Sequence, residues 1–466
     1  MEKHPWIPMT EEVREEMLQS IGKKDLKDLF SNIPSKFLLN RDLNIPESHT
    51  EIEVTQRMKY LASKNRSADD GRMFLGAGAG MHYIPSAVPA LAGRSEFVTA
   101  YTSYQPEISQ GMLQTLFEYQ SMMAELLSVD VVNSSMYDMA SGLAEAILMS
   151  TRVKKGRPRF LLPATMNPSH FQVASTYAEP LGIELEKIDF DPSTGLMSLT
   201  DLASKLDNRV AGVYIENPSF VGFIETQARR IGELAHEVGA LFVSGVDIMS
   251  LGVLVPPGDY GADIVLGEGQ SLGSTMSYGG PLLGVYGCIG DMKLIRQLPG
   301  RLVGMTRTTE EPHERGFVLT LSPREQHIRR EKATSNICSN QALLAVTAAV
   351  YTAVLGPSAL RHLGETVAYK ANYAAKKLDA IKGISAPAIK HAFWKEFVVR
   401  FENGITAREV HEELLKRGLH GGRILTDEFS QFGESMLLCV TEIHTKAVID
   451  ELVSAINEIV SQGGAA

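Results

Sequence analysis

Two acidic motifs follow predicted strands and are the first candidates for chemistry. Glu216-Asn217-Pro218 and Asp247 each come directly after an apolar run of the kind that forms buried strands. If these runs are parallel, both motifs lie at the carboxyl edge of one sheet, where ligands of such folds bind. A carboxylate there can hold a cationic ring nitrogen of a ligand, and it can equally cap the segment that follows.

The segment that should carry a reactive amine lacks one. In enzymes that use pyridoxal phosphate, a lysine forms the Schiff base and an Asp placed like Asp247 binds the pyridinium nitrogen. The expected lysine segment instead reads Gln270-Ser271, and the only lysine between Leu241 and Arg330 is Lys293, in a different context. The chain therefore has the scaffold of such an enzyme without its covalent anchor, so it either lacks the chemistry or depends on another chain.

A glycine-rich segment from Phe74 to Tyr83 resembles a phosphate-binding loop only superficially. Its spacing is G-x-G-x-G, no apolar strand precedes it, and Ile84-Pro85 interrupts the helix that would receive a pyrophosphate. A tight loop that brings His82 to a surface or cleft is the favoured interpretation. A plain turn is the alternative.

A tyrosine-rich segment offers groups that can both stack and form hydrogen bonds. It contains Tyr101, Tyr104, Gln105 and Glu107 ahead of a predicted helix. A surface loop with packed tyrosines explains the composition equally well.

A basic run, residues 322–337, contains Arg324, Arg330 and Lys332 close to His327. Such a run is usually a solvated face, and the alternative is anion binding or ion pairing across an interface. Residues 137–142, rich in small side chains at a helix start, suit either a phosphate cradle or close helix packing.

Composition describes an ordinary soluble chain of 466 residues with a net charge of -10, which argues against nucleic acid as a partner. No apolar signal core and no stretch of roughly 18 apolar residues is apparent, so we expect no membrane span and a cytoplasmic protein. The three cysteines, Cys288, Cys338 and Cys439, are widely spaced, and we expect them to be reduced and buried.

Alternating strand and helix patterns after Ser150 predict an α/β fold with a mostly parallel sheet. We expect three parts: an N-terminal helix and extended arm without a core of its own (1–70), a large α/β domain (71–340), and a linking helix with a small C-terminal α+β domain (341–466). Gly356-Pro357 should stop the linking helix.

Several long strings, taken in order, look like the N-terminal half of glycine cleavage system P-proteins. They include Phe74-Leu-Gly-Ala-Gly, the segment 99–111, Glu216-Asn-Pro, Tyr278-Gly-Gly-Pro and the segment 324–338, and they span nearly the whole chain. The length is similar to the alpha subunit of the split form. This resemblance implies a fold-type I pyridoxal-phosphate-dependent transferase-like architecture and an α2β2 heterotetramer, whose beta subunit carries the cofactor lysine where this chain has Gln270-Ser271.

The resemblance also implies an activity, with this chain alone inactive. The two subunits together would decarboxylate glycine and pass the aminomethyl group to the lipoyl arm of the H protein. The implied site residues lie at the interface, where the side chains His82, Tyr101, Tyr104, Gln105 and Glu107 approach the active-site mouth. Arg324, Arg330 and Lys332 would steady loops or the entering carrier, and Asp247 would be a vestige of a cofactor site.

Two alternatives stay open. One is a self-sufficient pyridoxal phosphate enzyme that uses Lys293 or Lys332. The other is a non-catalytic scaffold that stabilises a partner or recruits the carrier.

Overall fold

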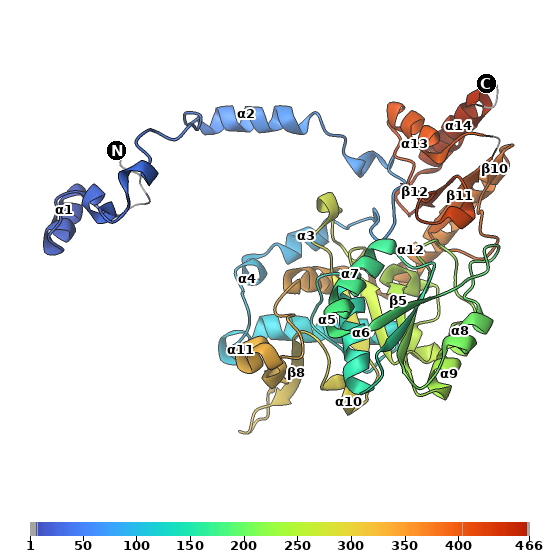
Figure 1. Cartoon of the computed structure of the whole chain (residues 1–466), viewed down its shortest axis with the longest axis horizontal. Coiled ribbons are helices and arrows are strands. Elements are labelled where there is room, and N and C mark those ends of the chain that lie inside the picture. Colours follow the sequence, from blue (N-terminus) through green and yellow to red (C-terminus); the bar gives the residue numbers. More distant parts are fainter. Residues whose placement is uncertain (1–5, 7, 403, 464–466) are drawn as a thin grey trace. The chain divides into compact units, whose positions relative to one another are not determined.

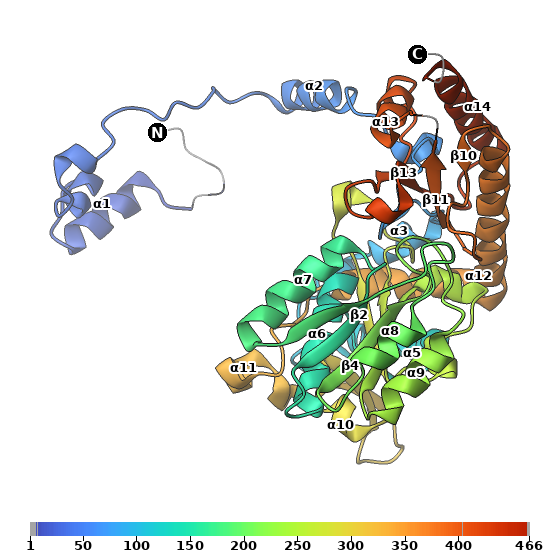
Figure 2. The same ribbon diagram turned by 45° about the vertical axis from the view of Figure 1, so that its right-hand side comes forward.

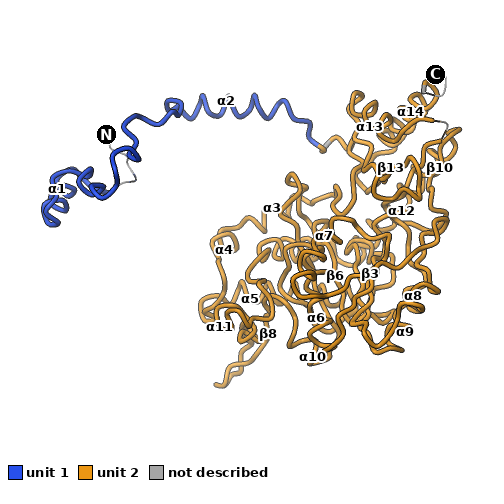
Figure 3. The backbone as a smooth tube through the Cα atoms, in the orientation of Figure 1, with its two compact units in different colours: residues 1–67 blue, residues 68–466 orange. Residues whose placement is uncertain are grey.

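The structure is a computed structural model that describes residues 6, 8–402 and 404–463. It separates into two compact units, residues 1–67 and residues 68–466 (Figure 3).

The first unit is a string of short helices. It contains α1 (Glu11–Ser20), the 3-10 turns η1 (Leu26–Phe30) and η2 (Ser35–Phe37), and α2 (Glu51–Ala62). The expectation of a purely extended arm is wrong for α2, because Thr50 and Glu53 form a reciprocal capping box that starts this helix. Leu18 is the only buried hydrophobic residue among those described in this unit, which agrees with an arm that has no core of its own.

A seven-stranded sheet organises the second unit (Figure 1). Its strand order is β1-β7-β6-β5-β4-β2-β3, with β3, β2, β4, β5 and β6 parallel and β7 and β1 antiparallel. The strands are β1 (Val131–Val132), β2 (Arg159–Pro163), β3 (Glu184–Ile188), β4 (Val210–Glu216), β5 (Leu241–Asp247), β6 (Ile264–Glu268) and β7 (Gly284–Cys288). The α/β class and the mostly parallel sheet are therefore confirmed.

Helices cover both faces of this sheet, which is why its central strands are apolar throughout. α6 and α7 pack with one core, whereas α5, α9 and the first half of α12 pack with the other. The helices up to α11 are α3 (Ala87–Ala92), α4 (Ser95–Val98), α5 (Gln110–Leu127), α6 (Met139–Val153), α7 (Pro168–Ala178), α8 (Leu199–Lys205), α9 (Ala228–Glu237), α10 (Met292–Ile295) and α11 (Gln326–Arg329). A separate hairpin, β8 (Leu302–Arg307) and β9 (Arg315–Thr320), packs on α5.

A second, antiparallel sheet forms the C-terminal part. Its order is β10-β11-β13-β12, and α13 and α14 belong to the same core. The elements are β10 (Ile384–Ser385), β11 (Glu396–Phe401), α13 (Ala407–Lys416), β12 (Arg423–Ile424), β13 (Ser435–Cys439) and α14 (Lys446–Gly463). A small α+β part is present as expected, while its boundary at residue 341 stays a prediction.

The long helix α12 (Ala342–Asp379) links the two sheets (Figure 2). Gly356, with a non-helical φ of 66°, ends the first helical segment as expected, and a second helical segment, which the sequence analysis did not expect, begins at Pro357. Proline fits the first turn of the new segment, where its missing N–H costs nothing.

α12 is the one helix among the described residues that is long and apolar enough to cross a membrane. Its first half packs against α3, α5 and η6 (Ile248–Gly252), and its second half against α14 and the small sheet. A core helix passes the same test of length and composition, so this property does not by itself identify a membrane span.

Candidate functional site

The carboxyl edge of the large sheet gathers acidic side chains as the sequence predicted. Strands β4, β5 and β6 end at Glu216, Asp247 and Glu268, and Asp247 lies opposite Glu268 in register. From the small C-terminal part, Lys395 and Glu396 reach the same place, and together these residues line a cavity of about 60 Å³. The edge is therefore a narrow, mostly acidic site with one lysine in it.

Asp247 is engaged twice within this site. Its Oδ1 accepts a hydrogen bond from the backbone N–H of Met249 at 3.0 Å, so it caps the following 3-10 turn. Its Oδ2 forms an ion pair with Lys395 Nζ. Burial alone would lower the pKa of Lys395, but Asp247, Cys439 and Glu396 raise that pKa above its usual value, so the ammonium is charged.

Lys395 is a site residue that none of the sequence motifs indicated. Its signal was a charged pair, Lys395-Glu396, at the start of an otherwise apolar strand. Glu396 also has a partner of its own, because its Oε1 accepts a hydrogen bond from the backbone N–H of Ala77 at 2.6 Å. Burial raises the pKa of Glu396, partly opposed by Lys395.

Glu268 is a further carboxyl of the edge. Burial raises its pKa to about 8, although backbone N–H groups of Leu283, Met139 and Gln270 donate to it and act in the opposite direction. At neutral pH this carboxyl is therefore mostly protonated.

Replacing Glu268 by Gln should change the pH dependence of stability. A folded-state pKa above the unfolded value of 4.5 means that ionisation disfavours the folded state, so Glu268 costs stability progressively as pH rises from about 5 to about 8. The Glu268→Gln variant lacks the acceptor for one backbone N–H at every pH, but its stability does not decline through ionisation at residue 268. Its stability relative to the wild type should therefore increase as pH rises. Urea midpoints at about pH 5 and pH 8 measure this. Glu365→Gln, on the exposed surface of α12, is the control, and a pH-independent difference for Glu268→Gln would contradict the prediction.

The place of the missing amine is filled by an amide that has its own partners. Gln270 is buried, its Oε1 accepts from the backbone N–H of Gly80 at 3.1 Å, and its Nε2 donates to the carbonyl of Ser274 at 2.8 Å. Ser271 is buried beside it. Gln270 thus ties the glycine-rich loop to the end of β6.

The N-terminus of α6 is already capped by carboxyl groups. Asp138 Oδ1 accepts from the backbone N–H of Ser141 at 2.7 Å, and Glu268 Oε2 accepts from the backbone N–H of Met139 at 3.2 Å. A Cβ on Gly142 would touch Leu266 and Tyr286 at 3.7 and 3.9 Å. A Cβ would therefore fit there, and it is the two carboxyl caps that argue against a phosphate cradle at this helix start.

These residues do not fit pyridoxal phosphate. Pockets that hold small ligands measure about 300–1,000 Å³, whereas this cavity has about 60 Å³. The ring-nitrogen partner Asp247 is paired with Lys395, and the helix N-terminus that suits a phosphate faces two carboxyl groups.

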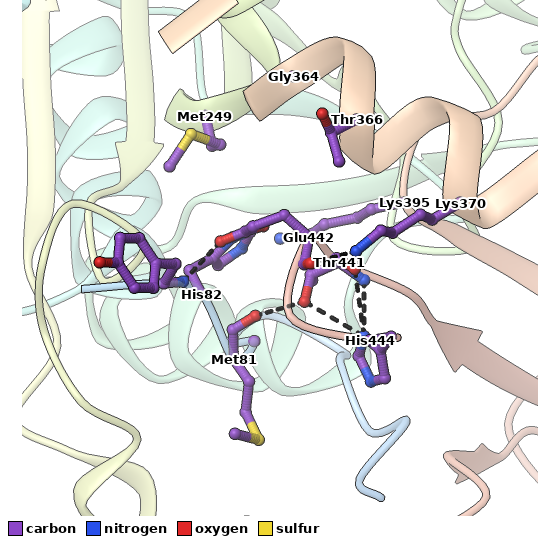
Figure 4. Close-up of polar contacts among 12 residues, drawn as sticks. Met81, His82, Met249, Gly364, Thr366, Lys370, Lys395, Thr441, Glu442 and His444 are labelled. Atoms are coloured by element: carbon purple, nitrogen blue, oxygen red, sulfur yellow. Dashed lines mark hydrogen bonds and ion pairs between the residues drawn. The ribbon is translucent and has the colours of Figure 1, made fainter. Parts of the chain in front are cut away.

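His82 lies against the small C-terminal part (Figure 4). Its side chain is only 1% exposed, and its Nδ1 is 3.0 Å from Glu442 Oε2. The other oxygen of Glu442 accepts from the backbone N–H of Tyr83 at 2.6 Å, and Lys370 Nζ donates to the carbonyl of Glu442. Burial would raise the pKa of Glu442, but His82 and the N–H of Tyr83 hold it below its usual value.

Tyr104 belongs to a different cluster, built around Arg301. Arg301 Nη2 donates to the Tyr104 hydroxyl at 2.7 Å, and the guanidinium lies 4.6 Å from the centre of the Tyr104 ring. His327 meets that ring edge-on at 5.5 Å. The buried ion pair of Arg301 with Glu325, at 2.9 Å, fixes the guanidinium.

Cys338 lies at the border of this cluster and is exposed, so the expectation that all three cysteines are buried is wrong for it. Arg301 donates to its Sγ at 3.0 Å. Partial burial would raise the pKa of Cys338, but the hydrogen bonds from Arg301 and Ser339 lower it. Cys288 and Cys439 are buried as expected.

The remaining predicted residues are mostly solvent-facing. Arg324 is half-buried and donates to the carbonyls of Leu298, Gly300 and Leu321, so it holds loop backbone together. The other five are exposed and have no side-chain partner within the described part of the chain: Tyr101, Gln105, Glu107, Arg330 and Lys332. Their roles stay predictions.

Comparison with known proteins agrees with this geometry. A sequence profile of the glycine cleavage system P-protein matches residues 4–456. The chain belongs to this family. It is 47% identical to the probable glycine dehydrogenase (decarboxylating) subunit 1 of Staphylothermus marinus, over 99% of both chains, and 48% identical to that of Pyrococcus abyssi, over 99% of this chain and 100% of the relative.

Solved structures confirm the predicted fold of this P-protein family member. A crystal structure of glycine decarboxylase (P-protein) in inhibitor-bound form is similar with a TM-score of 0.86 at 38% identity, covering 98% of this chain and all of that one. A sphingosine-1-phosphate lyase from Burkholderia pseudomallei shares the fold alone, with a TM-score of 0.66 at 14% identity. The architecture is that of fold-type I pyridoxal-phosphate-dependent enzymes.

Proposed function

We propose that the chain is subunit 1 of a glycine dehydrogenase (decarboxylating), an oxidoreductase of the glycine cleavage system. Together with a homologous, lysine-bearing subunit, it decarboxylates glycine and passes the aminomethyl group to the lipoyl arm of the H protein. The observation that carries this is full-length membership of the P-protein family combined with a sheet edge that has no lysine at Gln270-Ser271 and no room for a cofactor.

The cofactor of this system is pyridoxal phosphate, and we infer that the partner subunit holds it covalently. Two observations support this division. The segment expected to provide the Schiff base has an amide and a hydroxyl, both buried, and the acidic edge around Asp247 is closed by Lys395.

The self-sufficient alternative has no geometric support. Lys293 is on α10, which follows the end of β7 that pairs with the start of β6, so it lies at the sheet edge opposite Asp247. Lys332 is exposed in the 3-10 turn η10 (Arg330–Lys332). Neither amine approaches the acidic edge.

The N-terminal unit supports an obligatory partner. Nearly all of its large apolar side chains are exposed in the isolated chain, and α2 shows Val54, Met58 and Leu61 at helical spacing on one face. Apolar surface of this extent marks an interaction site. We assign it to the partner subunit of an α2β2 heterotetramer.

The face around Tyr104 is the proposed contribution of this chain to the active site of the complex. It is half-exposed, amphipathic and held rigidly by Arg301, and exposed Tyr101 and Glu107 lie in the same segment. Such a surface can position a substrate or carrier held mainly by the partner.

Glycine decarboxylation by the assembled complex tests the proposal. Neither subunit alone should release carbon dioxide from glycine, and the mixture should. Tyr104→Ala should lower the turnover of the complex about tenfold or more through lost positioning. The matched control is Tyr369→Ala, which removes a tyrosine that is 74% exposed on α12. Unchanged turnover of Tyr104→Ala in an intact complex would favour the scaffold alternative, and activity of this chain alone would overturn the proposal.

A further inference from the structure

The ion pair between Asp247 and Lys395 connects the two sheets of the second unit. Asp247 ends β5 of the large sheet, whereas Lys395 immediately precedes β11 of the small sheet. Lys395 is 8% exposed, and its ammonium lies among Asp247, Glu396 and the thiol of Cys439. The ammonium of Lys395, which belongs to the small-sheet part, thus contacts the acidic edge of the large sheet.

The backbone around Lys395 holds this cation in place. The carbonyl of Lys395 accepts from the backbone N–H of Val440 at 2.9 Å, and the preceding Trp394 is buried with its indole N–H donating to the carbonyl of Gly364 at 3.0 Å. Strand pairing of Glu396 with Cys439 fixes the other side. The backbone from which the Lys395 side chain extends is therefore fixed by buried contacts on both sides.

We propose that Lys395 stands in for the cofactor in this chain: its ammonium takes the place on Asp247 that a cationic ring nitrogen would occupy, and thereby excludes pyridoxal phosphate by occupancy. The loss of the Schiff-base lysine is then one barrier to the cofactor, and the Lys395 ammonium on Asp247 is a separate one. An amine restored at residue 271 alone does not recover cofactor binding. This inference concerns only the chain's own sheet edge, so it does not depend on the activity of the complex.

The test restores the amine with and without Lys395, in the full-length chain. The variants are Ser271→Lys, Ser271→Lys with Lys395→Ala, and, as the matched control, Ser271→Lys with Lys390→Ala, since Lys390 is an exposed lysine of the same small part. Added pyridoxal phosphate condenses through its aldehyde with the amine at residue 271 and releases water, and borohydride reduces the resulting C=N bond. Mass spectrometry then locates the pyridoxyl adduct.

We expect an adduct at residue 271 only when Lys395 is removed. An adduct in Ser271→Lys with Lys395 intact would overturn the proposal, and that outcome needs no second substitution. Absence of an adduct in the folded Ser271→Lys, Lys395→Ala variant would also overturn it, because other groups would then be the barrier. Thermal unfolding shows whether each variant is folded. Equilibrium dialysis of pyridoxal phosphate with Lys395→Ala alone gives a second readout, with more retention expected for the variant than for the wild type, whose exposed lysines set the background.

Discussion

Replacing Lys395 by Met in the full-length chain lowers the free energy of unfolding by about 3 kcal/mol, the lower end expected for a broken buried pair, because it leaves the largely buried carboxylate of Asp247 without its cation. Met has a similar length and fills much of the same volume, so the loss reports charge rather than a cavity. Asp247 is then uncompensated, and Glu396 loses the nearby cation that opposes the rise of its pKa by burial. Urea unfolding measures the effect.

A second variant separates the ion pair from general damage. Asp247→Asn combined with Lys395→Met removes both charges and should recover much of the loss, since a neutral pair of similar shape carries no buried charge. The double variant is thus expected to unfold at a higher urea concentration than Lys395→Met. If the two substitutions simply add, Asp247 and Lys395 are not energetically coupled and the interpretation of the edge fails.

Charges on the apolar face of α2 weaken binding of the partner subunit by at least about 100-fold. Two apolar side chains buried in an interface contribute about 1.5–3 kcal/mol each, which corresponds to two or more orders of magnitude in affinity. The variant Val54→Glu with Met58→Glu places two carboxylates on the exposed stripe of α2. Titration of the purified partner subunit by calorimetry gives the affinity.

Gln56→Glu is the matched control for this prediction, because Gln56 is exposed on the opposite face of the same helix. Its affinity for the partner should stay within a factor of about three of the wild type, the change expected of a peripheral interface charge. Equal affinities for the two variants would show that the arm does not bind the partner through this face. Because all three substituted side chains are exposed, neither variant should alter the urea midpoint of residues 68–466.

Local patterns were sufficient for most elements of the fold. Apolar runs without polar interruption predicted β2, β4, β5 and β6, since strands covered by helices on both faces need no alternation. α2 was missed although Thr50 and Glu53 carry its capping box, because the surrounding Pro, Asn and charge concealed it. At Gly356-Pro357 the local signal was correct for an interruption, but packing against the small sheet decided that the helix resumes.

By itself, the sequence determined the family, the fold class and the absence of an amine at Gln270-Ser271, because these depend on residue identity and on periodicity along the chain. It also placed Glu216 and Asp247 at one edge, since parallel strands bring their carboxyl ends together. Only the tertiary structure decided that Lys395, 148 positions after Asp247, closes that edge, and that His82 pairs with Glu442 rather than joining Tyr104. Pairing across such separations is set by how two sheets pack on each other, and no local pattern encodes which charges then meet.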